Sequence, residues 1–246
     1  MWYPVFLVAV ILVYFTMTLP VVKGFIGELI VRFVLKFLDK RRFRVFNDVY
    51  FPAYNGLFMQ IDHLVIGRGV VFVIETKNYN GIIEGDWRRK YWTMRKKGHN
   101  AKVYNPMRQS SYHVRMLKEN KIVPDIVRIY PIVCLGPLAK PEVIGRIPVV
   151  TPQKLPGCIK KIAGNERQKG EIAVTWQDLQ NKMLTGRKIK GEHIRKLGLI
   201  SHRKKEGICP RCGGKLFYRN SMRGRIAICT NYPWCKYRNL SQNLKQ

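Results

Sequence analysis

Acidic side chains are scarce in this sequence of 246 residues, where 15 Asp and Glu stand against 45 Lys and Arg and give a formal net charge of +30. A charge of that size attracts polyanions and speeds their association. Solubility alone requires a net charge of only ~2–8 in a small domain. The shortage of acid therefore indicates a polyanionic partner, either nucleic acid or the anionic surface of a membrane.

Internal repeats and low-complexity tracts are absent, and an apolar content of 46% is sufficient for a folded core. A chain of this length holds one ordinary domain with smaller attachments. Cysteine is rare outside the C-terminal region, which holds four of the six. This clustering favours a metal site in a reducing compartment over disulfides. The other two, Cys134 and Cys158, are expected to be buried as apolar residues.

Charged side chains are missing altogether from residues 2–22. At ~1.5 Å per residue such a helix can cross a hydrocarbon core of ~30 Å. The aromatic rings of Trp2 and Tyr3 stand where interfacial residues are expected. A cleaved signal peptide is the main alternative, but neither its positive first region nor its small-residue cleavage site is visible. We therefore expect a transmembrane helix over residues 1–22 and membrane attachment through it.

The charges that flank this segment predict its orientation. Seven basic residues follow the segment and none precedes it: Lys23, Arg32, Lys36, Lys40, Arg41, Arg42 and Arg44. The positive-inside rule then places the longer C-terminal part in the cytoplasm. The expected location is the cell membrane, with a single pass.

The body of the chain combines helical and strand patterns. Apolar residues recur at helical spacing over 24–40, and on periodicity alone Glu28 in that segment is a solvated carboxylate. Residues rich in β-branched and aromatic side chains predict strands over 42–51, 57–67, 70–79, 81–84, 91–95, 127–135 and 147–151.

A second helix is expected to begin at Pro106, with Asn105 as its cap, and to end near Asn120. Its expected core-facing residues are Met107, Ser111, Val114 and Leu117. One or two helices should precede a basic segment that starts at Gly186. Strands alternating with helices predict an α/β domain.

Three charged residues, Asp62, Glu75 and Lys77, lie in the apolar hairpin closed by Gly67-Arg68-Gly69. A two-residue loop places Asp62 opposite Glu75, whereas a three-residue loop makes them diagonal neighbours. Lys77 shares a strand face with Glu75. Because both faces of the hairpin are apolar, these charges require a partner, and Mg²⁺ is a suitable one. An ordinary Glu–Lys pair with a solvated Asp62 remains the alternative.

Four sequence blocks together resemble the nuclease-related domain (NERD domain). They are GxxGE at 24–28, FNDVYFP at 46–52, MQIDHLVIGRGVVFVIETKNYNG at 59–81 and NPMRQSSYHVRML at 105–117. The resemblance covers residues 23–154. That domain belongs to the PD-(D/E)xK superfamily, so the resemblance implies a restriction-endonuclease-like mixed sheet flanked by helices and a Mg²⁺-dependent phosphodiesterase site.

The resemblance also implies roles for individual residues. Asp62 and Glu75 would bind Mg²⁺ or Mn²⁺, and Lys77 would position water or offset charge on the phosphate. Glu28 would complete the acidic cluster, and Gln109 would lie beside the site. His63 receives no role from the resemblance and is expected to be a packed histidine.

The C-terminal region carries four cysteines with the spacing of a Zn²⁺ ribbon, namely Cys209, Cys212, Cys229 and Cys235. The segment resembles the zinc ribbon of type IA DNA topoisomerases, which implies binding of single-stranded DNA. Residues 187–246 contain 16 Lys and Arg but 2 acids, a local net charge of +14.

Five aromatic residues are interleaved with these charges: Phe217, Tyr218, Tyr232, Trp234 and Tyr237. Their rings could stack on bases. The alternative is that they pack around the metal in a purely structural site. Charge on the ribbon surface would allow nucleic-acid binding in either case.

The expected domain order is a transmembrane helix over 1–22, a nuclease-like domain over 23–154, a helical and basic linker over 155–205, and a zinc ribbon over 206–246. The leading hypothesis is a membrane-anchored nuclease that cuts DNA on the cytoplasmic side, with RNA as a second candidate partner. A protein that tethers nucleic acid to the membrane without cutting it is the alternative. A lipid-surface module is the third hypothesis, and the zinc ribbon counts against it.

Overall fold

A computed structural model of the chain describes residue 6 and residues 19–53, 57–96, 98–165, 177, 179–221, 224–232, 234–235 and 237–240. Within these residues no helix is both long and apolar enough to cross a membrane. The span predicted over 1–22 lies outside the described residues, apart from Phe6 and residues 19–22. Of these, Pro20 to Val22 form the first turn of helix α2.

The described chain divides into two compact units, and unit 1 comprises residues 1–51 and 59–184. Its main sheet has five strands in the order β1-β2-β3-β7-β9. Their bounds are β1 Arg44–Pro52, β2 Phe58–Gly67, β3 Val70–Lys77, β7 Arg128–Leu135 and β9 Val149–Val150. The sheet is mixed, because β2 pairs antiparallel with β3 while β3–β7 and β7–β9 are parallel.

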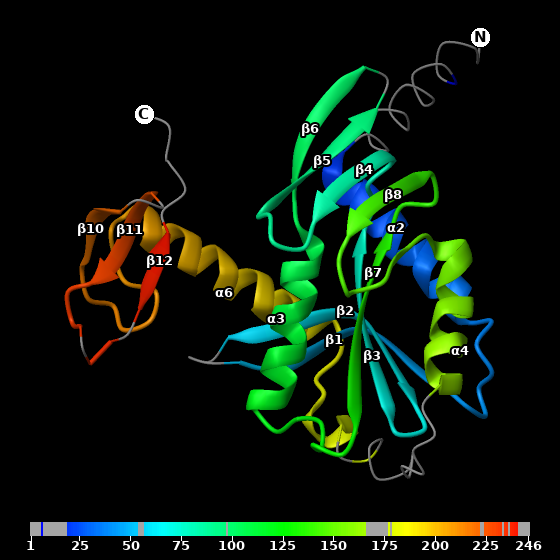
Figure 1. Ribbon diagram of the computed structural model, residues 1–246. Coiled ribbons are helices and arrows are strands. Elements are labelled where there is room, and N and C mark those ends of the chain that lie inside the picture. The colour runs from blue at the N-terminus through cyan, green and yellow to red at the C-terminus, as the bar shows by residue number, and fades with distance from the viewer. Residues whose placement is uncertain are drawn as a thin grey trace. The chain divides into compact units, whose positions relative to one another are not determined.

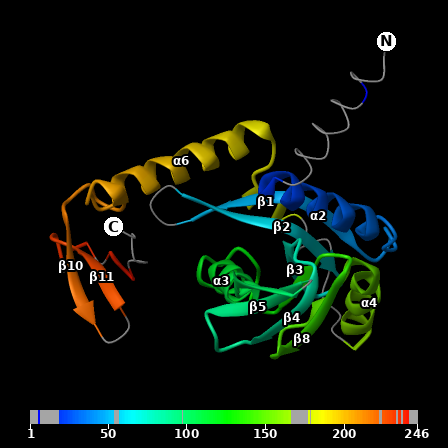
Figure 2. The ribbon, with the colours of Figure 1, turned by 90° about the horizontal axis from the view of Figure 1, so that it is seen from above.

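Helices cover both faces of this sheet (Figures 1 and 2). On one face, α2 (Pro20–Leu35) and α4 (Leu155–Asn165) bury an apolar cluster with Phe72 and Ile74 of β3. On the other face, α3 (Pro106–Glu119) packs against β3 and β7. The predicted fold class, a mixed sheet flanked by helices, is confirmed. Since Leu155 and Ile159 of α4 are fully buried in this core, the helix that follows residue 154 is part of the folded body.

A second sheet of four strands, in the order β6-β5-β4-β8, packs in unit 1 near the N-terminal end of α3. Its bounds are β4 Gly81–Asp86, β5 Tyr91–Lys96, β6 His99–Tyr104 and β8 Ala139–Ile144. The sequence did not predict β6 or β8. Both are edge strands with mostly exposed residues, so neither shows the apolar alternation that marks a half-buried strand.

The helix predictions need two corrections. Helix α2 begins at Pro20 and ends at Leu35, earlier at both ends than the predicted range. Asn105 caps α3 as predicted, since its Oδ1 accepts from the Met107 amide at 2.9 Å. The predicted core face of α3 was wrong at Ser111, which is exposed; the helix buries Ser110 and His113 instead.

Unit 2 comprises residues 52–58 and 185–246. It contains α6 (Arg187–Lys205), a helix with no buried residue, and a small antiparallel sheet. The strands of that sheet are β10 Leu216–Ser221, β11 Gly224–Cys229 and β12 Arg238–Leu240. The basic segment expected from Gly186 is therefore helical over α6.

Candidate active site and zinc ribbon

The β2–β3 hairpin brings Asp62 to Glu75. Gly67 pairs with Val70 and His63 with Ile74, so the loop has two residues, and Gly69 within it has a φ of 68°. Continuing this register places Asp62 opposite Glu75. The Oδ2 atom of Asp62 accepts a hydrogen bond from the Thr76 amide at 2.8 Å, which fixes the aspartate against β3.

Glu75 is fully buried, and neither carboxylate oxygen has a hydrogen-bond donor at a favourable angle in the described structure. Lys77 forms an ion pair with it, with Nζ 2.6 Å from Oε1. Burial, together with the negative charge of Asp62, raises the pKa of Glu75 to about 8, although Lys77 opposes the shift. A buried carboxylate of this kind gains from a cation that satisfies its oxygens.

Lys77 remains positively charged at neutral pH. Burial alone would lower its pKa, but the charges of Glu75 and Asp62 overcome burial and raise the pKa above its ordinary value. Its side chain is 27% exposed, so the ammonium group lies at the border between the buried carboxylates and solvent. A phosphate that approaches the site from solvent would meet this positive charge.

His113 of α3 also faces Glu75, and the sequence analysis missed it. Its Nδ1 atom lies 3.5 Å from Oε2, too long for a hydrogen bond. Burial, and to a lesser degree the charge of Lys77, lowers the pKa of His113 to about 4, so the imidazole is neutral at pH 7. Seven-residue spacing from the buried Pro106 at the helix start would have placed His113 on the core face.

Helix α2 contributes the third carboxylate. The negative charge of Glu28 adds to the rise in the pKa of Glu75, so Glu28 belongs to the same electrostatic cluster. Gly27 explains the close approach, because a Cβ atom there would lie 2.9 Å from Cβ of Asn78. Asn78, directly after β3, donates to the carbonyl oxygen of Lys23 at 2.7 Å and ties the helix to the strand end.

Gln109, the fifth residue that the resemblance implicated, is half-buried on α3 and lines a cavity whose other walls come from the β4–β5 turn and the segment after β8. The structure thus gathers Asp62, Glu75 and Lys77, with Glu28 in electrostatic contact. Gln109 and His113 are four residues apart, so the side of α3 that faces Glu75 also borders the cavity.

Strand β1 lies next to β2 in the main sheet and makes polar contacts with side chains of that strand. Asp48 adopts a φ of 54°, which aspartate tolerates, and accepts hydrogen bonds from the Tyr50 hydroxyl at 2.8 Å and from Gln60 Nε2 at 2.9 Å. His63 Nδ1 lies 2.7 Å from Oδ1 of Asn47, and burial lowers the pKa of His63 to about 3. His63 is therefore the packed, neutral histidine that the sequence analysis expected.

We predict that Glu75→Gln stabilises the cation-free protein as pH rises. The pKa of Glu75 is about 8 in the folded protein and 4.5 ordinarily, so ionisation opposes folding increasingly from pH 4.5 and fully above pH 8. Glutamine does not ionise. In buffer without Mg²⁺ or Mn²⁺, the stability of the variant should be close to that of wild type at pH 5 and exceed it at pH 8.5 by roughly 4 kcal/mol, at about 1.4 kcal/mol per unit of pKa difference. The corresponding shift in Tm is ~8–16 °C.

Scanning calorimetry over this pH range measures the difference. The matched control is Glu142→Gln, because Glu142 is exposed on β8. A Tm difference between the Glu75 variant and wild type that does not change with pH would contradict the assignment of a buried, destabilising carboxylate.

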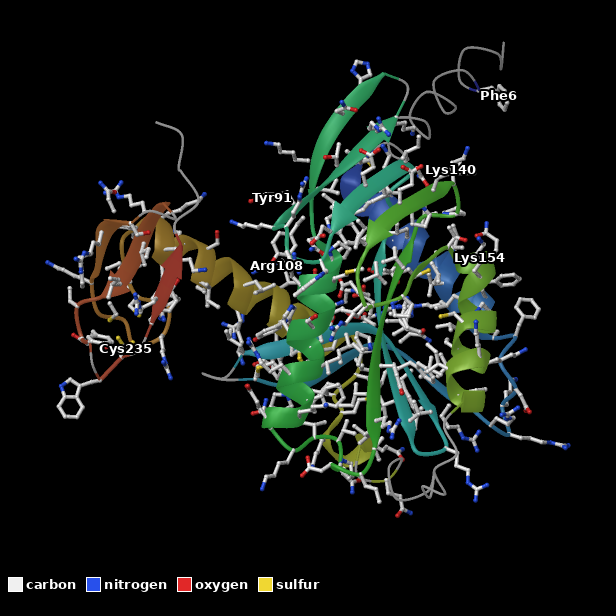
Figure 3. The ribbon with its side chains drawn as sticks, in the orientation of Figure 1. Phe6, Tyr91, Arg108, Lys140, Lys154 and Cys235 are labelled. Carbon is white, nitrogen blue, oxygen red and sulfur yellow. The ribbon has the colours of Figure 1, made fainter. Side chains whose placement is uncertain are left out.

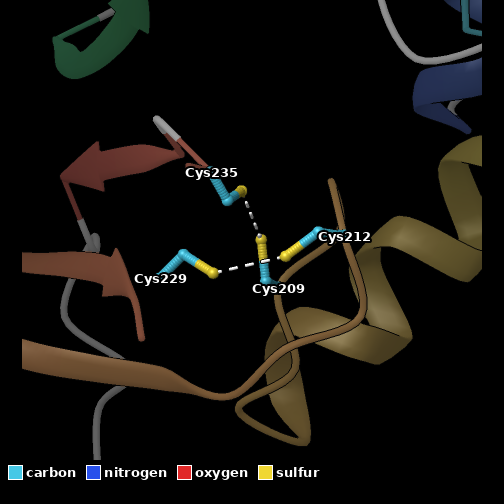
Figure 4. A group of neighbouring side chains, drawn as sticks. All are labelled: Cys209, Cys212, Cys229 and Cys235. Carbon is cyan, nitrogen blue, oxygen red and sulfur yellow. Dashed lines mark hydrogen bonds between the residues drawn. The ribbon is translucent and has the colours of Figure 1, made fainter. Parts of the chain in front are cut away.

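The four cysteines of unit 2 converge in one cluster (Figure 4), with their Sγ atoms all within 4.8 Å of one another. Sγ of Cys209 lies 3.7 Å from that of Cys235, and Sγ of Cys212 lies 3.4 Å from that of Cys229. Four sulfurs around Zn²⁺ at ~2.3 Å in a tetrahedron are ~3.8 Å apart. The donor set and its spacing therefore fit zinc.

Backbone amides support the sulfurs as they do in thiolate sites. The Arg211 amide donates to Sγ of Cys209 and the Asn231 amide to Sγ of Cys229, each at 3.4 Å. Gly213 has a φ of 78° just after Cys212, a conformation that suits glycine and turns the chain back toward β10.

The five aromatic side chains of the ribbon fall into two groups, one packed around the cysteines and one exposed to solvent. Tyr237 packs against the cysteine cluster, as a structural role requires. Phe217, Tyr218, Tyr232 and Trp234 are exposed, Trp234 by 92%. Arg225 lies over the ring of Tyr218, at 4.7 Å from its centroid. Four rings and a basic surface are thus accessible to a ligand.

Comparisons with known proteins match two separate regions of the chain to two different families. The family described as nuclease-related domain matches residues 23–136, and that described as topoisomerase DNA binding C4 zinc finger matches residues 206–243. The chain is similar to an uncharacterized protein of Bacillus anthracis, with 37% identity over 102 residues that cover 40% of this chain and 47% of that protein. It spans about half the length of this relative.

The C-terminal region is similar to DNA topoisomerase 1 of Helicobacter pylori. Identity is 45% over 42 residues for strain J99, covering 17% of this chain and 6% of the enzyme. For strain 26695 it is 50% over 36 residues, covering 15% and 5%. No solved structure gives a significant match. Two family models thus match separate parts of the chain, that of the nuclease-related domain over residues 23–136 and that of the topoisomerase DNA binding C4 zinc finger over residues 206–243.

Proposed function

We propose that this protein is a metal-dependent nuclease that hydrolyses phosphodiester bonds of DNA, with its zinc ribbon binding the nucleic acid. The observation that carries the proposal is the fully buried Glu75 carboxylate, which lies beside Asp62 and within 2.6 Å of the Lys77 ammonium. The mixed sheet flanked by helices is consistent with a restriction-endonuclease-like domain, and the family matches support action on nucleic acid.

The residues present fit a hard divalent cation. Mg²⁺ and Mn²⁺ prefer oxygen ligands, and Mg²⁺ takes one or two carboxylates while its other ligands are water and phosphate oxygens. Asp62 and Glu75 supply the carboxylates, and Oε2 of Glu75 has no hydrogen-bond partner among the described residues. When bound, such a cation would polarise the phosphate and lower the pKa of an attacking water.

The chain's own residues would orient and stabilise the reacting groups. The Thr76 amide fixes Asp62 through one oxygen, so the aspartate is held ready without rearrangement. Lys77 carries its positive charge where the site opens to solvent and would offset the negative charge that develops on the phosphate. His113 packs against Glu75 as a neutral ring and would keep the carboxylate in its orientation.

The test is incubation of the full chain with single- and double-stranded DNA, in Mg²⁺, in Mn²⁺ and in buffer without a divalent cation. We expect cleavage only with the added cation. Tight binding without cleavage, over several substrates and both cations, would contradict the nuclease and favour a protein that only holds nucleic acid.

We propose further that the uncharged segment over residues 2–22 anchors the protein in the cell membrane, with the remainder in the cytoplasm. Its length, its lack of charge and the basic residues that follow support this orientation. Flotation of cell membranes after carbonate washing should carry the full chain, and protease added outside spheroplasts should leave the ribbon intact. Release by carbonate would contradict the anchor.

A further inference from the structure

A cavity of about 1170 Å³ opens on unit 1 beside α3, and the reaction outlined above uses none of its lining residues. We call it the α3 groove. Its walls are α3, the β4–β5 turn with Trp87 and Arg88, and the segment after β8 with Arg146. These segments are distant in the sequence, so only folding creates the groove.

The charge of the α3 groove has one sign. Four arginines line it, namely Arg88, Arg108, Arg115 and Arg146, and no acidic side chain is among its lining residues in the described structure. Figure 3 shows Arg108 near the N-terminal end of α3. Two acids border these arginines: Glu119 is 3.8 Å from Nε of Arg115, an exposed pair that contributes little, and Oδ1 of Asp86 accepts a hydrogen bond from the Arg88 amide at 2.7 Å. The groove therefore suits a polyanion.

Three aromatic rings are interleaved with these arginines. Trp87, Tyr104 and Tyr112 line the groove, and each is roughly half exposed, at 51%, 42% and 43%. Arg88 lies over the ring of Trp87 at 5.2 Å, and Arg115 over the ring of Tyr112 at 5.6 Å. Rings that face a basic groove can stack on bases, and the bases of a duplex are not accessible to such rings.

Asn105 holds two walls of the α3 groove together through hydrogen bonds. Its Nδ2 donates to three carbonyl oxygens of the β4–β5 turn, those of Asp86 at 3.2 Å, Trp87 at 3.3 Å and Arg89 at 2.7 Å. The same side chain caps α3 through Oδ1. One fully buried amide thus joins the turn that carries Trp87 to the helix that carries Arg108.

Gly145 closes the third wall. A Cβ atom at this position would lie 2.7 Å from Cε of Met107 and 3.3 Å from Cβ of Trp87. The amide of Trp87 donates to the carbonyl oxygen of Ile144 at 3.0 Å. The segment with Arg146 therefore lies tightly against both other walls, and the groove is preorganised.

We infer that the α3 groove binds single-stranded nucleic acid and holds the strand beside the proposed catalytic site. Arg108, Tyr112 and Arg115 follow one stripe of α3 at spacings of four and three residues, while His113 faces Glu75. Gln109, which also lines the groove, is four residues before His113 and shares its side of the helix, so the groove borders the proposed catalytic site. The inference identifies single-stranded nucleic acid as the substrate of the proposed nuclease. Only this role as substrate rests on the proposed function; binding in the α3 groove does not.

Photo-crosslinking of the full chain to oligo(dT) that contains 5-iododeoxyuridine tests the inference, in buffer without divalent cations so that no cleavage occurs. Mass spectrometry of the adducts should place crosslinks at Trp87, Tyr104 or Tyr112, in addition to the ribbon. Crosslinks confined to unit 2 would overturn the inference. Equal crosslinking of the groove to a fully paired duplex would also overturn the inference, because binding would then not require unpaired bases.

The matched variants are Arg108→Gln with Arg115→Gln, and, as control, Arg41→Gln with Arg68→Gln, two exposed arginines outside the groove lining. Both pairs remove the same charge. The groove pair should lower crosslink yield about tenfold and reduce the slope of log affinity against log salt by ~1.4, at ~0.7 per phosphate contact on a single strand. Equal losses in the two pairs would overturn the inference.

The two proposals fail separately. If cation-dependent cleavage is absent but the groove crosslinks persist, binding of a single strand in the α3 groove is confirmed and the nuclease activity is refuted. If cleavage occurs while the groove pair cleaves and crosslinks as wild type does, the nuclease stands and the groove is refuted.

Discussion

Lys77→Ala should reduce the rate of cation-dependent DNA cleavage by roughly 10²–10³-fold while leaving DNA affinity within about threefold of wild type. Lys77 is the ammonium group that lies between the buried carboxylates and solvent, so its loss removes charge stabilisation from the reaction. Binding depends on the many other basic residues of the chain. Single-turnover cleavage and fluorescence anisotropy measure the two quantities.

Two further variants keep this test informative. Lys77→Gln keeps a polar side chain that is one atom shorter and guards against a packing defect, and Lys102→Ala removes an exposed lysine of β6 as a matched charge control. The glutamine variant should lose activity with the alanine variant, and the control should retain it. Parallel losses of binding and cleavage at position 77 would contradict a catalytic role.

Cys229→Ser should remove zinc from the protein, with metal content falling from about one ion per chain to nearly none. The apolar cluster of the ribbon consists of three cysteines with Leu216 and Tyr237 packed against it, so little else holds the ribbon together. Because the exposed aromatic residues would lose their scaffold, affinity for single-stranded DNA should fall by roughly 10- to 100-fold, the equivalent of about one stacked base.

Plasma emission spectrometry measures the zinc, and anisotropy measures the affinity. The control is Cys158→Ser, a cysteine that packs against the core of unit 1 and should leave the zinc content unchanged. The Cys229 variant should still melt cooperatively, because the core of unit 1 contains none of the zinc ligands. Full zinc content in the Cys229 variant would contradict the four-cysteine site.

The local parts of the site could be predicted from the sequence. The Gly67-Arg68-Gly69 turn limits the hairpin to two registers, both of which bring Asp62 next to Glu75, and the structure has the two-residue loop. The spacing of the cysteines likewise predicts a single cluster, because each pair is close in the chain. Short-range geometry of this kind follows from strand pairing and metal coordination.

The parts that depend on distant segments could not be predicted. His113 reaches Glu75 only through the packing of α3 on the main sheet. The predicted core face of that helix was wrong at Ser111, although Met107 and Leu117 are buried as predicted. The edge strands β6 and β8 carry no apolar alternation. The α3 groove joins three segments, two of them through hydrogen bonds from one asparagine, and no periodicity in the sequence indicates those contacts.

The most direct test of the central claim, that Asp62 and Glu75 form a cation site for phosphodiester hydrolysis, is calorimetric titration of Mn²⁺ into the zinc-loaded protein and its Asp62→Asn variant. Asparagine can still accept the hydrogen bond from the Thr76 amide, so the hairpin should remain folded. Mn²⁺ should bind wild type, and the variant should bind it at least roughly tenfold more weakly. Equal affinity in the two proteins, or no binding to wild type at millimolar Mn²⁺, would contradict the claim.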